Sequence, residues 1–199
     1  MDWLALGAIV VAFLLGGVPF GLIIGRAKGV DLRRIGSGNI GATNVARNLG
    51  MRWGVFCLLL DALKGLAPTL AARMLLDPGG PLTQWAIGGT MLAAVCGHMF
   101  TPYLLFRGGK GVATALGVVL AVNPWAGLIA GLLYVGLYVA LRISSVGSMA
   151  LTISAPLAMY LLKAPCEQLY AVLVIALLIV IKHIPNLRRL IRGEEGKVR

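Results

Sequence analysis

The chain has 199 residues, of which 59% are hydrophobic and 13% are charged, and its formal net charge is +11. An ordinary soluble domain has about 25% charged residues, so this composition excludes a soluble globular enzyme, a disordered tail and a collagen-like fibre. It predicts an all-α integral membrane protein that forms a single membrane-embedded domain over residues 1–199, because the chain leaves no room for a second domain of useful size.

Long apolar segments separated by turns and polar loops predict a seven-transmembrane-helix bundle with short middle helices. The predicted spans are residues 3–25, 53–76, 82–106, two short helices within 112–141, 143–162 and 168–181. The segment 112–141 is too long for one untilted span, and Asn123-Pro124 near its middle marks a turn. A re-entrant hairpin that enters and leaves on one face is the alternative, so the sequence leaves open whether this segment crosses the bilayer twice.

Small and charged residues in the first two spans predict how these spans pack. Gly17, Gly21 and Gly25 recur at four-residue spacing, which predicts that a neighbouring helix approaches this face closely. Asp61 and Lys64 lie one helical turn apart in the second span, where charges are costly unless they pair or line a site. We interpret them as an i,i+3 ion pair that stabilises the fold.

Basic residues gather on one side of the predicted bundle. That side holds 15 of the 18 Lys and Arg residues, the opposite side holds Arg73 and Lys163, and Lys64 lies within a span. Because basic residues collect on the cytoplasmic side of membrane proteins, this distribution predicts an N-terminus outside and a C-terminus in the cytoplasm. The fifteen residues lie in the segments 26–52, 107–110, 142 and 182–199.

Four clusters of polar donors lie on this basic side. The largest runs from Gly36 to Arg47 and alternates small residues with short polar side chains. Successive backbone N–H groups in such a loop can form an anion-binding nest, and a guanidinium suits phosphate. The side-chain donors of this cluster are Ser37, Asn39, Thr43, Asn44 and Arg47.

The second cluster, from Gly108 to Thr114, places glycines and Lys110 at the mouth of a helix. Free backbone N–H groups and the helix dipole favour an anion there, although a flexible loop that obeys the positive-inside rule explains the cluster equally well. The third cluster, residues 142–148, and the fourth, residues 182–186, are weaker when taken alone. We interpret His98, close to the same side, first as a structural hydrogen-bonding residue and second as a residue that acts from behind the site.

Taken together, these clusters resemble the motifs of the bacterial membrane-bound acyl-phosphate:glycerol-3-phosphate acyltransferases, the PlsY type. The resemblance covers about Phe13 to Glu195. Its carrying residues are Gly36 to Arg47, Asp61 with Lys64-Gly65, Gly97-His98-Met99, Gly108 to Thr114, Arg142 to Ser148, and His183 with Asn186. One departure is Ile184-Pro185, where the family usually has a polar or charged pair. Proline fixes the backbone and removes a donor. Among the residues matched to the family motifs, Asn186 is therefore the one whose position the motif determines least.

The resemblance implies an enzyme of the bacterial cytoplasmic (inner) membrane with its active site facing the cytoplasm. It implies transfer of a fatty acyl group from acyl-phosphate to the sn-1 hydroxyl of glycerol 3-phosphate, giving 1-acyl-sn-glycerol 3-phosphate (lysophosphatidic acid) and phosphate. This is the first acylation of phospholipid biosynthesis, and it needs no metal and no cofactor. The implied partners are the bilayer and an enzyme that makes acyl-phosphate, but no nucleic acid.

The family motifs also imply a role for individual residues. The acyl-phosphate would be bound by Ser37, Gly38, Asn39, Gly41, Thr43, Gly108, Gly109 and Lys110. Glycerol 3-phosphate would be bound by Arg47, Lys110, Ser145, His183 and Asn186, which are also the expected catalytic residues.

The chemistry of these residues agrees with the resemblance in kind. An acyl-phosphate has a good leaving group, so catalysis can rest on holding two anions together and neutralising charge. The departing phosphate can accept the hydroxyl proton, and His183 is the rival base. A transporter for a small organic phosphate would place such donors near the bilayer midplane, whereas these lie at loop ends on one face, which favours an enzyme. The sequence leaves open the acyl chain preference, the oligomeric state and the order of substrate binding.

Overall fold

The computed structural model of the protein describes residues 3–80 and 82–197, and every regular element in these ranges is a helix. The helices are α1 (Trp3–Gly17), α2 (Phe20–Ala27), α3 (Ala42–Leu49), α4 (Met51–Leu75), α5 (Thr83–Met99), the 3-10 helix η1 (Pro102–Leu104), α6 (Val112–Val122), α7 (Pro124–Leu141), α8 (Ser144–Leu161) and α9 (Cys166–Ile191). Five segments, α1 with α2, α4, α7, α8 and α9, are long and apolar enough to cross a membrane. The chain is therefore a multi-pass membrane protein, as the composition predicts.

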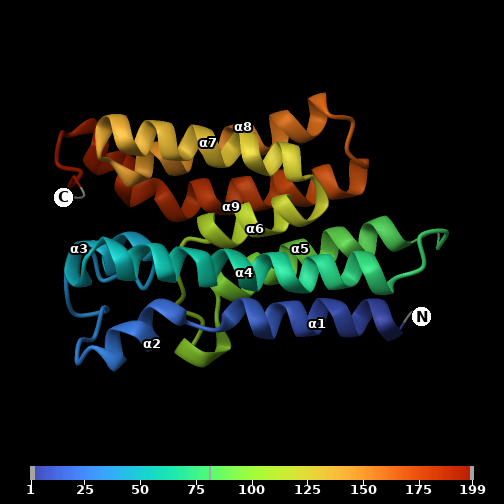
Figure 1. Ribbon diagram of the computed structural model, residues 1–199, viewed down its shortest axis with the longest axis horizontal. Helices are drawn as coiled ribbons and strands as arrows, with labels where there is room; N and C mark the ends of the chain where they lie inside the picture. The colour runs from blue at the N-terminus through green and yellow to red at the C-terminus, as the bar shows by residue number, and fades with distance from the viewer. Residues whose placement is uncertain (1–2, 81, 198–199) are drawn as a thin grey trace.

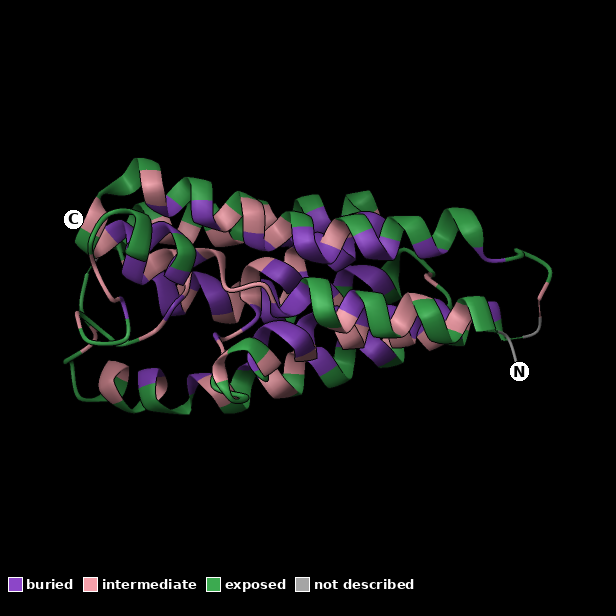
Figure 2. Ribbon diagram, turned by 90° about the horizontal axis from the view of Figure 1, so that it is seen from below, coloured by how far each residue is buried: buried purple, intermediate pink, exposed green. Residues whose placement is uncertain are grey.

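The helices form a bundle in which α4, α5 and α6 lie between two outer groups (Figure 1). On one side α1 packs against α5 and α4, and on the other side α7 packs against α8, which in turn packs against α9. Buried residues gather in the centre of the bundle and exposed residues cover its outside (Figure 2). The outside is rich in apolar side chains such as Leu132, Ile153 and Leu177, which are 60–70% exposed in the protein alone and suit contact with lipid.

Small residues bring the central helices unusually close together. A Cβ atom added to Gly16 of α1 would lie 2.1 Å from the Ala94 carbonyl oxygen of α5, and one added to Gly117 of α6 would lie 1.9 Å from that of Ala62 of α4. Backbones can approach so closely only where side chains are absent. The contacts fix α5 and α6, whose ends carry the functional loops, against the longer helices.

The first predicted span is broken at Val18-Pro19, between α1 and α2. The break frees carbonyl groups that have no water to bond inside a membrane. The Thr101 hydroxyl donates to the Gly17 oxygen at 2.7 Å, and Lys64 Nζ donates to the Val18 oxygen at 2.8 Å. The ion pair predicted between Asp61 and Lys64 is confirmed, with 2.8 Å between Asp61 Oδ1 and Lys64 Nζ.

The glycine stripe of this span packs closely, and at Gly21 and Gly25 the nearest atoms belong to loop backbone rather than to a neighbouring helix. Cβ atoms added to Gly21 and Gly25 would come within 1.8 and 2.8 Å of the carbonyl oxygens of Ile40 and Val30. Both oxygens belong to the loop between α2 and α3 rather than to another helix. Because the helix is interrupted at proline, the stripe serves to seat this loop against the bundle.

Three predicted boundaries differ from the structure. The span 82–106 ends as a helix at Met99, because Pro102 starts a 3-10 turn and Leu105 and Phe106 adopt left-handed backbone conformations. The polar stretch 26–52 contains a helix of its own, α3. The last helix, predicted over 168–181, runs from Cys166 to Ile191, so Pro185 lies inside it. A proline within a helix removes one backbone hydrogen bond without necessarily ending the helix.

The predicted division of 112–141 at Asn123-Pro124 is found between α6 and α7. Asn123 Oδ1 accepts a hydrogen bond from the Ala126 N–H at 3.1 Å, and Pro124 occupies the first helical position. At 1.5 Å per residue α7 extends about 27 Å but α6 only about 16 Å, about half of a hydrocarbon core. Helix α6 therefore begins inside the bundle, where its N-terminus meets the cavity described next.

Candidate active site

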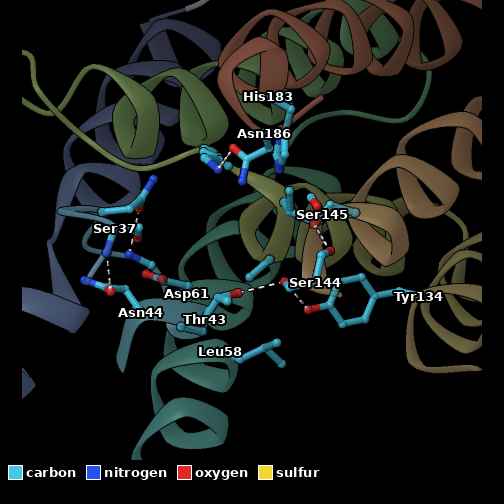
Figure 3. A pocket seen from close by; sticks show the side chains of 18 of the residues that line it. Ser37, Thr43, Asn44, Leu58, Asp61, Tyr134, Ser144, Ser145, His183 and Asn186 are labelled. Atoms are coloured by element: carbon cyan, nitrogen blue, oxygen red, sulfur yellow. Dashed lines mark hydrogen bonds between the residues drawn. The ribbon is translucent and has the colours of Figure 1, made fainter. Parts of the chain in front are cut away.

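A cavity opens between α3 and α4 on one side and α8 and α9 on the other, with the start of α6 beside it (Figure 3). One part of its wall is polar and cationic, formed by Ser37, Asn39, Thr43, Asn44, Arg47, Lys110, Ser145, His183, Asn186 and Glu195. Another part is apolar, formed by Leu58, Val112, Ala113, Leu116 and Leu151. The cavity thus combines a surface of polar and charged side chains with an apolar surface.

Asn44 holds the loop that precedes α3 in place. Its side-chain oxygen accepts the Ser37 N–H at 3.0 Å, and its amide nitrogen donates to the carbonyl oxygens of Leu32 and Ile35. Within the same loop, the Gly38 N–H donates to Ile35 and the Gly41 N–H donates to the Asn39 side chain.

These internal bonds correct one prediction about the loop. The backbone N–H groups of Ser37, Gly38 and Gly41 are already occupied, so they do not form the predicted anion-binding nest in this structure. The loop instead presents side chains to the cavity, among them those of Ser37, Asn39 and Thr43. Gly36 and Gly38 adopt positive φ angles of 56° and 68°, which explains why glycine is needed at both turns.

The lysine loop, residues 107–111, is fixed to the end of α5. Its Gly108 N–H donates to the Met99 oxygen at 3.1 Å and its Gly109 N–H donates to the His98 oxygen at 3.0 Å. Neither N–H is therefore free to bind a phosphate, contrary to what the glycine-lysine motif suggests alone. The first turn of α6, where Gly111, Val112 and Ala113 line the cavity, offers backbone N–H groups instead.

Lys110 reaches from this loop across to α9. Its ammonium group donates to the side-chain oxygen of Asn186. Burial lowers the pKa of Lys110 to about 8, helped by the positive charges of Arg189 and Arg47 and opposed by Glu195. With this pKa most of the Lys110 side chains are still protonated at neutral pH. A phosphate group placed beside Lys110 would stabilise its charged form and raise the pKa.

The inner end of α9 contributes His183 and Asn186, one helical turn apart and both buried. His183 Nδ1 lies 2.9 Å from the Ile179 carbonyl oxygen, which can only accept, so Nδ1 carries the proton in the neutral ring. Nε2 of the neutral ring is then an acceptor. It suits a substrate hydroxyl better than a phosphate oxygen, which would need a donor.

The segment after α9 folds back over the cavity and brings in Glu195. Its carboxylate accepts hydrogen bonds from Asn186 Nδ2 at 2.6 Å and Arg189 Nε at 2.8 Å, and its side chain is 4% exposed. Burial acts to raise the pKa of Glu195, but these hydrogen bonds hold that pKa below its usual value. Arg47 Nη2 donates to the Gly196 oxygen, so the same segment also ties α3 to α9.

A chain of hydroxyl groups links α3, α8 and α7 across the cavity (Figure 3). Thr43 Oγ1 lies 2.7 Å from Ser144 Oγ, which lies 3.2 Å from Tyr134 Oη. Leu58 of α4 lies on the apolar side of this chain. In Figure 3 this hydroxyl chain lies between Leu58 and the polar side chains of His183 and Asn186.

Most of the predicted site residues meet in this one cavity, although they come from four separate parts of the sequence. Its lining includes the predicted Ser37, Asn39, Gly41, Thr43, Arg47, Lys110, Ser145, His183 and Asn186. Gly38, Gly108 and Gly109 are not in the lining, and they shape the turns behind it.

Sequence reasoning missed Tyr134, Ser144 and Glu195, and it favoured a structural role over a role at the site for Asp61 and His98, which both line the cavity. Ser144 lies in the third donor cluster and Glu195 ends the resembling region, so both were within reach of the motifs. Tyr134 lies in an apolar helix and in none of the donor clusters, so the sequence around it does not indicate a role at the site. Only the packing of α7 against α8 brings it to the cavity.

Comparisons with known proteins agree with this arrangement. The family model described as Glycerol-3-phosphate acyltransferase matches residues 6–193. The chain is 47% identical over 198 residues to a glycerol-3-phosphate acyltransferase of Anaeromyxobacter sp. (strain Fw109-5), covering 98% of this chain and 97% of that protein. It is 44% identical to that of Aquifex aeolicus (strain VF5), covering 97% and 98%.

A solved structure has the same fold. The crystal structure of PlsY (YgiH), an integral membrane glycerol 3-phosphate acyltransferase in its glycerol 3-phosphate form, superposes with a TM-score of 0.91 and 44% identity. The superposition covers 97% of this chain and 94% of that one. The lysophosphatidic acid form of PlsY superposes with a TM-score of 0.89 and 42% identity, with the same coverage.

Proposed function

The chain belongs to the glycerol-3-phosphate acyltransferase family, and we propose that it transfers a fatty acyl group from acyl-phosphate to the sn-1 hydroxyl of glycerol 3-phosphate. The products are 1-acyl-sn-glycerol 3-phosphate and phosphate. The observation that carries this proposal is the junction of a cationic surface and an apolar surface in one cavity. Both substrates carry phosphate and one carries a fatty chain, so the two surfaces match the pair.

Binding of the two anions is assigned to the residues around Lys110. Lys110 and Arg47 supply positive charge, and Ser145 and Asn186 add neutral donors on the opposite wall. We assign glycerol 3-phosphate to these residues together with His183. We assign the acyl-phosphate group to Lys110, the first turn of α6 and the side chains of Ser37, Asn39 and Thr43, which line the cavity. Gly38, Gly41, Gly108 and Gly109 shape the backbone around this position.

In the reaction, the sn-1 hydroxyl oxygen attacks the acyl carbonyl carbon and forms the ester bond. The bond between that carbon and the phosphate oxygen breaks, and the departing phosphate takes the hydroxyl proton. Lys110 neutralises the charge that develops on the leaving phosphate. Holding both substrates in this geometry removes most of the entropic barrier, so no separate side-chain base is required.

His183 is assigned to binding rather than to proton removal. Its Nδ1–H donates to the Ile179 oxygen of its own helix, which leaves Nε2 to accept a hydrogen bond from a glycerol hydroxyl. Nδ1 thus pairs with a backbone carbonyl oxygen, whereas in the bases of hydrolytic triads it pairs with a carboxylate. The leaving phosphate is the better placed acceptor for the proton, since it is formed at the reacting carbon.

The membrane position follows from the same assignment. Glycerol 3-phosphate is water-soluble and the acyl-phosphate is a lipid, so the cavity should open to the cytoplasmic face of the bacterial inner membrane. We infer a seven-crossing topology with an external N-terminus, in which the basic loops lie on that face. An enzyme that makes acyl-phosphate would deliver its product to the same face and is the expected partner.

The test uses purified protein with palmitoyl-phosphate and radiolabelled glycerol 3-phosphate, without coenzyme A, carrier protein or added metal. We expect labelled 1-acylglycerol 3-phosphate and an equal amount of released phosphate. Acylation of glycerol 3-phosphate only with palmitoyl-coenzyme A or an acylated carrier protein would contradict the proposed donor. Accumulation of labelled glycerol 3-phosphate inside vesicles without acylation would instead show a transporter.

A further inference from the structure

A buried charged cluster lies directly behind the lysine loop. Asp61 and Lys64 of α4 and His98 of α5 are each at most 6% exposed. Asp61 Oδ1 lies 2.8 Å from Lys64 Nζ and 3.7 Å from His98 Nδ1. Lys64 also donates to the Val18 oxygen at the break between α1 and α2, so the cluster is anchored at three helices. Buried charges persist in membrane proteins where they pair or serve a site, and this cluster does both.

His98 is the member of the cluster that touches the loop. Its backbone oxygen accepts the Gly109 N–H at 3.0 Å. Its imidazole lies against the same glycine, since a Cβ atom added to Gly109 would lie only 2.2 Å from His98 Nε2. The ring is thus enclosed between Asp61 on its Nδ1 side and Gly109 on its Nε2 side. It has no room to turn away without breaking one of these contacts.

We propose that His98, oriented by Asp61, is a positioning residue. It fixes the position of the Gly108–Lys110 loop relative to the cavity and thereby directs the Lys110 side chain toward the phosphate groups of the substrates. This role rests on the proposed acyl transfer. His98 lines the cavity, but it acts on Lys110 through Gly109, against which its ring packs. The reaction needs a lysine placed to within a fraction of an ångström, since misplacement by about 1 Å can cost about 100-fold in rate.

Two neighbouring glycines provide a test with an internal control. A Cβ atom on Gly109 would meet the far end of the His98 side chain, whereas one on Gly108 would lie 2.0 Å from the His98 backbone oxygen. Truncating His98 to alanine therefore removes the first obstacle but leaves the second. The His98 contact predicts that His98→Ala relieves the effect of Gly109→Ala and does not relieve that of Gly108→Ala.

The experiment measures kcat/KM with palmitoyl-phosphate for each single variant and both double variants. We expect Gly109→Ala alone to lose about 100-fold, but to cost less than about fivefold when added to His98→Ala, because the two sites are coupled. Gly108→Ala should cost the same factor in both backgrounds. His98→Asn, whose amide can occupy the position of Nδ1 beside Asp61, should retain more activity than His98→Ala and raise KM more than it lowers kcat.

Equilibrium binding of radiolabelled inorganic phosphate separates this proposal from the proposed function. If wild-type protein fails to acylate glycerol 3-phosphate but the phosphate affinities of the variants show the same coupling, the reaction is wrong and the role of His98 stands. Equal costs of Gly109→Ala with and without His98 would overturn the positioning role. Thermal unfolding in detergent, with Gly136→Ala as a glycine control that has open space around its added Cβ atom, confirms that the compared proteins are folded.

Discussion

Lys110 combines a positive charge with a partly desolvated position between two helices. It donates to Asn186 and faces Arg47, Arg189 and Glu195 through electrostatic interactions. A cation in such a place gains most when an anion arrives, so it should contribute to both binding and rate.

Removal of the Lys110 charge should therefore cost activity without unfolding the protein. We expect Lys110→Ala to lower kcat/KM about 100- to 1,000-fold, as loss of one preorganised charge-stabilising group does in other enzymes. The side chain lies in a loop that adds little apolar packing, so the thermal midpoint should stay near that of the wild type. Near-normal turnover in a well-folded Lys110→Ala protein would refute the assignment.

The lowered pKa of Lys110 also predicts how activity responds to pH. In the free protein this pKa is about 8, so the ammonium charge is present below that pH and is lost as the pH rises through it. A profile of kcat/KM, which reports the free enzyme, should fall on its alkaline side near pH 8. Lys110→Arg keeps its charge in this range, and its residual activity should not show the same fall. An unchanged alkaline fall in that variant would assign the titration to another group.

His183 offers two distinguishable substitutions because its two ring nitrogens have different partners. Gln can place an oxygen near the position of Nε2, whereas Asn reaches only as far as Nδ1. If Nε2 binds a glycerol hydroxyl, His183→Asn should raise the KM for glycerol 3-phosphate about 10-fold, the cost of one hydrogen bond of about 1.4 kcal/mol. His183→Gln should raise it less. A collapse of kcat at unchanged KM in both variants would identify His183 as the general base instead.

At the scale of elements, close helix contacts depend on glycine at particular positions. Gly16 and Gly7 lie on the same helix, α1, but only Gly16 faces a neighbour, the Ala94 oxygen of α5 at 2.1 Å from an added Cβ atom. We expect Gly16→Val to lower the free energy of unfolding by about 1–3 kcal/mol through overpacking. Gly7→Val, with open space around it, should leave the thermal midpoint unchanged. Equal midpoints for the two variants would show that α1 and α5 adjust freely.

The elements also show what could be predicted from sequence. Apolar length and turn residues predicted the break at Asn123-Pro124 because both signals are local. The same local reasoning ended the last span at residue 181, because the segment from Lys182 onward is polar. Helix α9 instead continues to Ile191, where the returning Glu195 satisfies Asn186 and Arg189. That stabilisation depends on the chain folding back after the helix ends, which the local sequence around Pro185 does not show.

The candidate site shows the same division between local and tertiary information. Motifs identified the donors Lys110, Arg47 and Asn186, since phosphate chemistry restricts the residue types that can bind it. The backbone N–H groups of the glycine loops were predicted to be free, but they bond within their own surroundings, as for Gly109 with the His98 oxygen. Such pairing depends on which carbonyl groups the fold brings near, so it becomes visible only in the structure.

At the scale of the whole molecule, the charge asymmetry coincides with the shape of the bundle. The two ends of the described chain lie at opposite ends of the bundle (Figure 1). The loop before α3 and the segment after α9 lie at one end, and the turn between α4 and α5 lies at the other. The basic segments thus meet at the end that carries the cavity residues Arg47 and Glu195. If a bilayer crosses the middle of the bundle, the positive-inside rule predicts that this end lies on the cytoplasmic side.

Orientation in the membrane can be measured by labelling single cysteines in intact cells. In a background that lacks Cys57, Cys96 and Cys166, a membrane-impermeant thiol reagent should label cysteines at Gly79 and Lys163 from outside. Cysteines at Ser37, Arg107 and Gly193 should react only after the cells are opened. All five positions are exposed in the structure, so a lack of labelling reports the side of the membrane rather than burial.

Positions 107 and 142 form the decisive pair in this experiment, because they flank α6 and α7. If α6 and α7 together leave and return to the cytoplasmic face, both positions are protected in intact cells, whether or not α6 crosses fully. Helix α6 has 11 residues and is too short to span the hydrocarbon core. Its end at position 123 should therefore lie within the membrane, and a cysteine there is labelled from outside only if the reagent can enter the bundle to reach it. If positions 107 and 142 react from opposite faces, the segment crosses once. The basic residues after α9 would then lie outside, and both the seven-crossing topology and the cytoplasmic position of the site would be wrong.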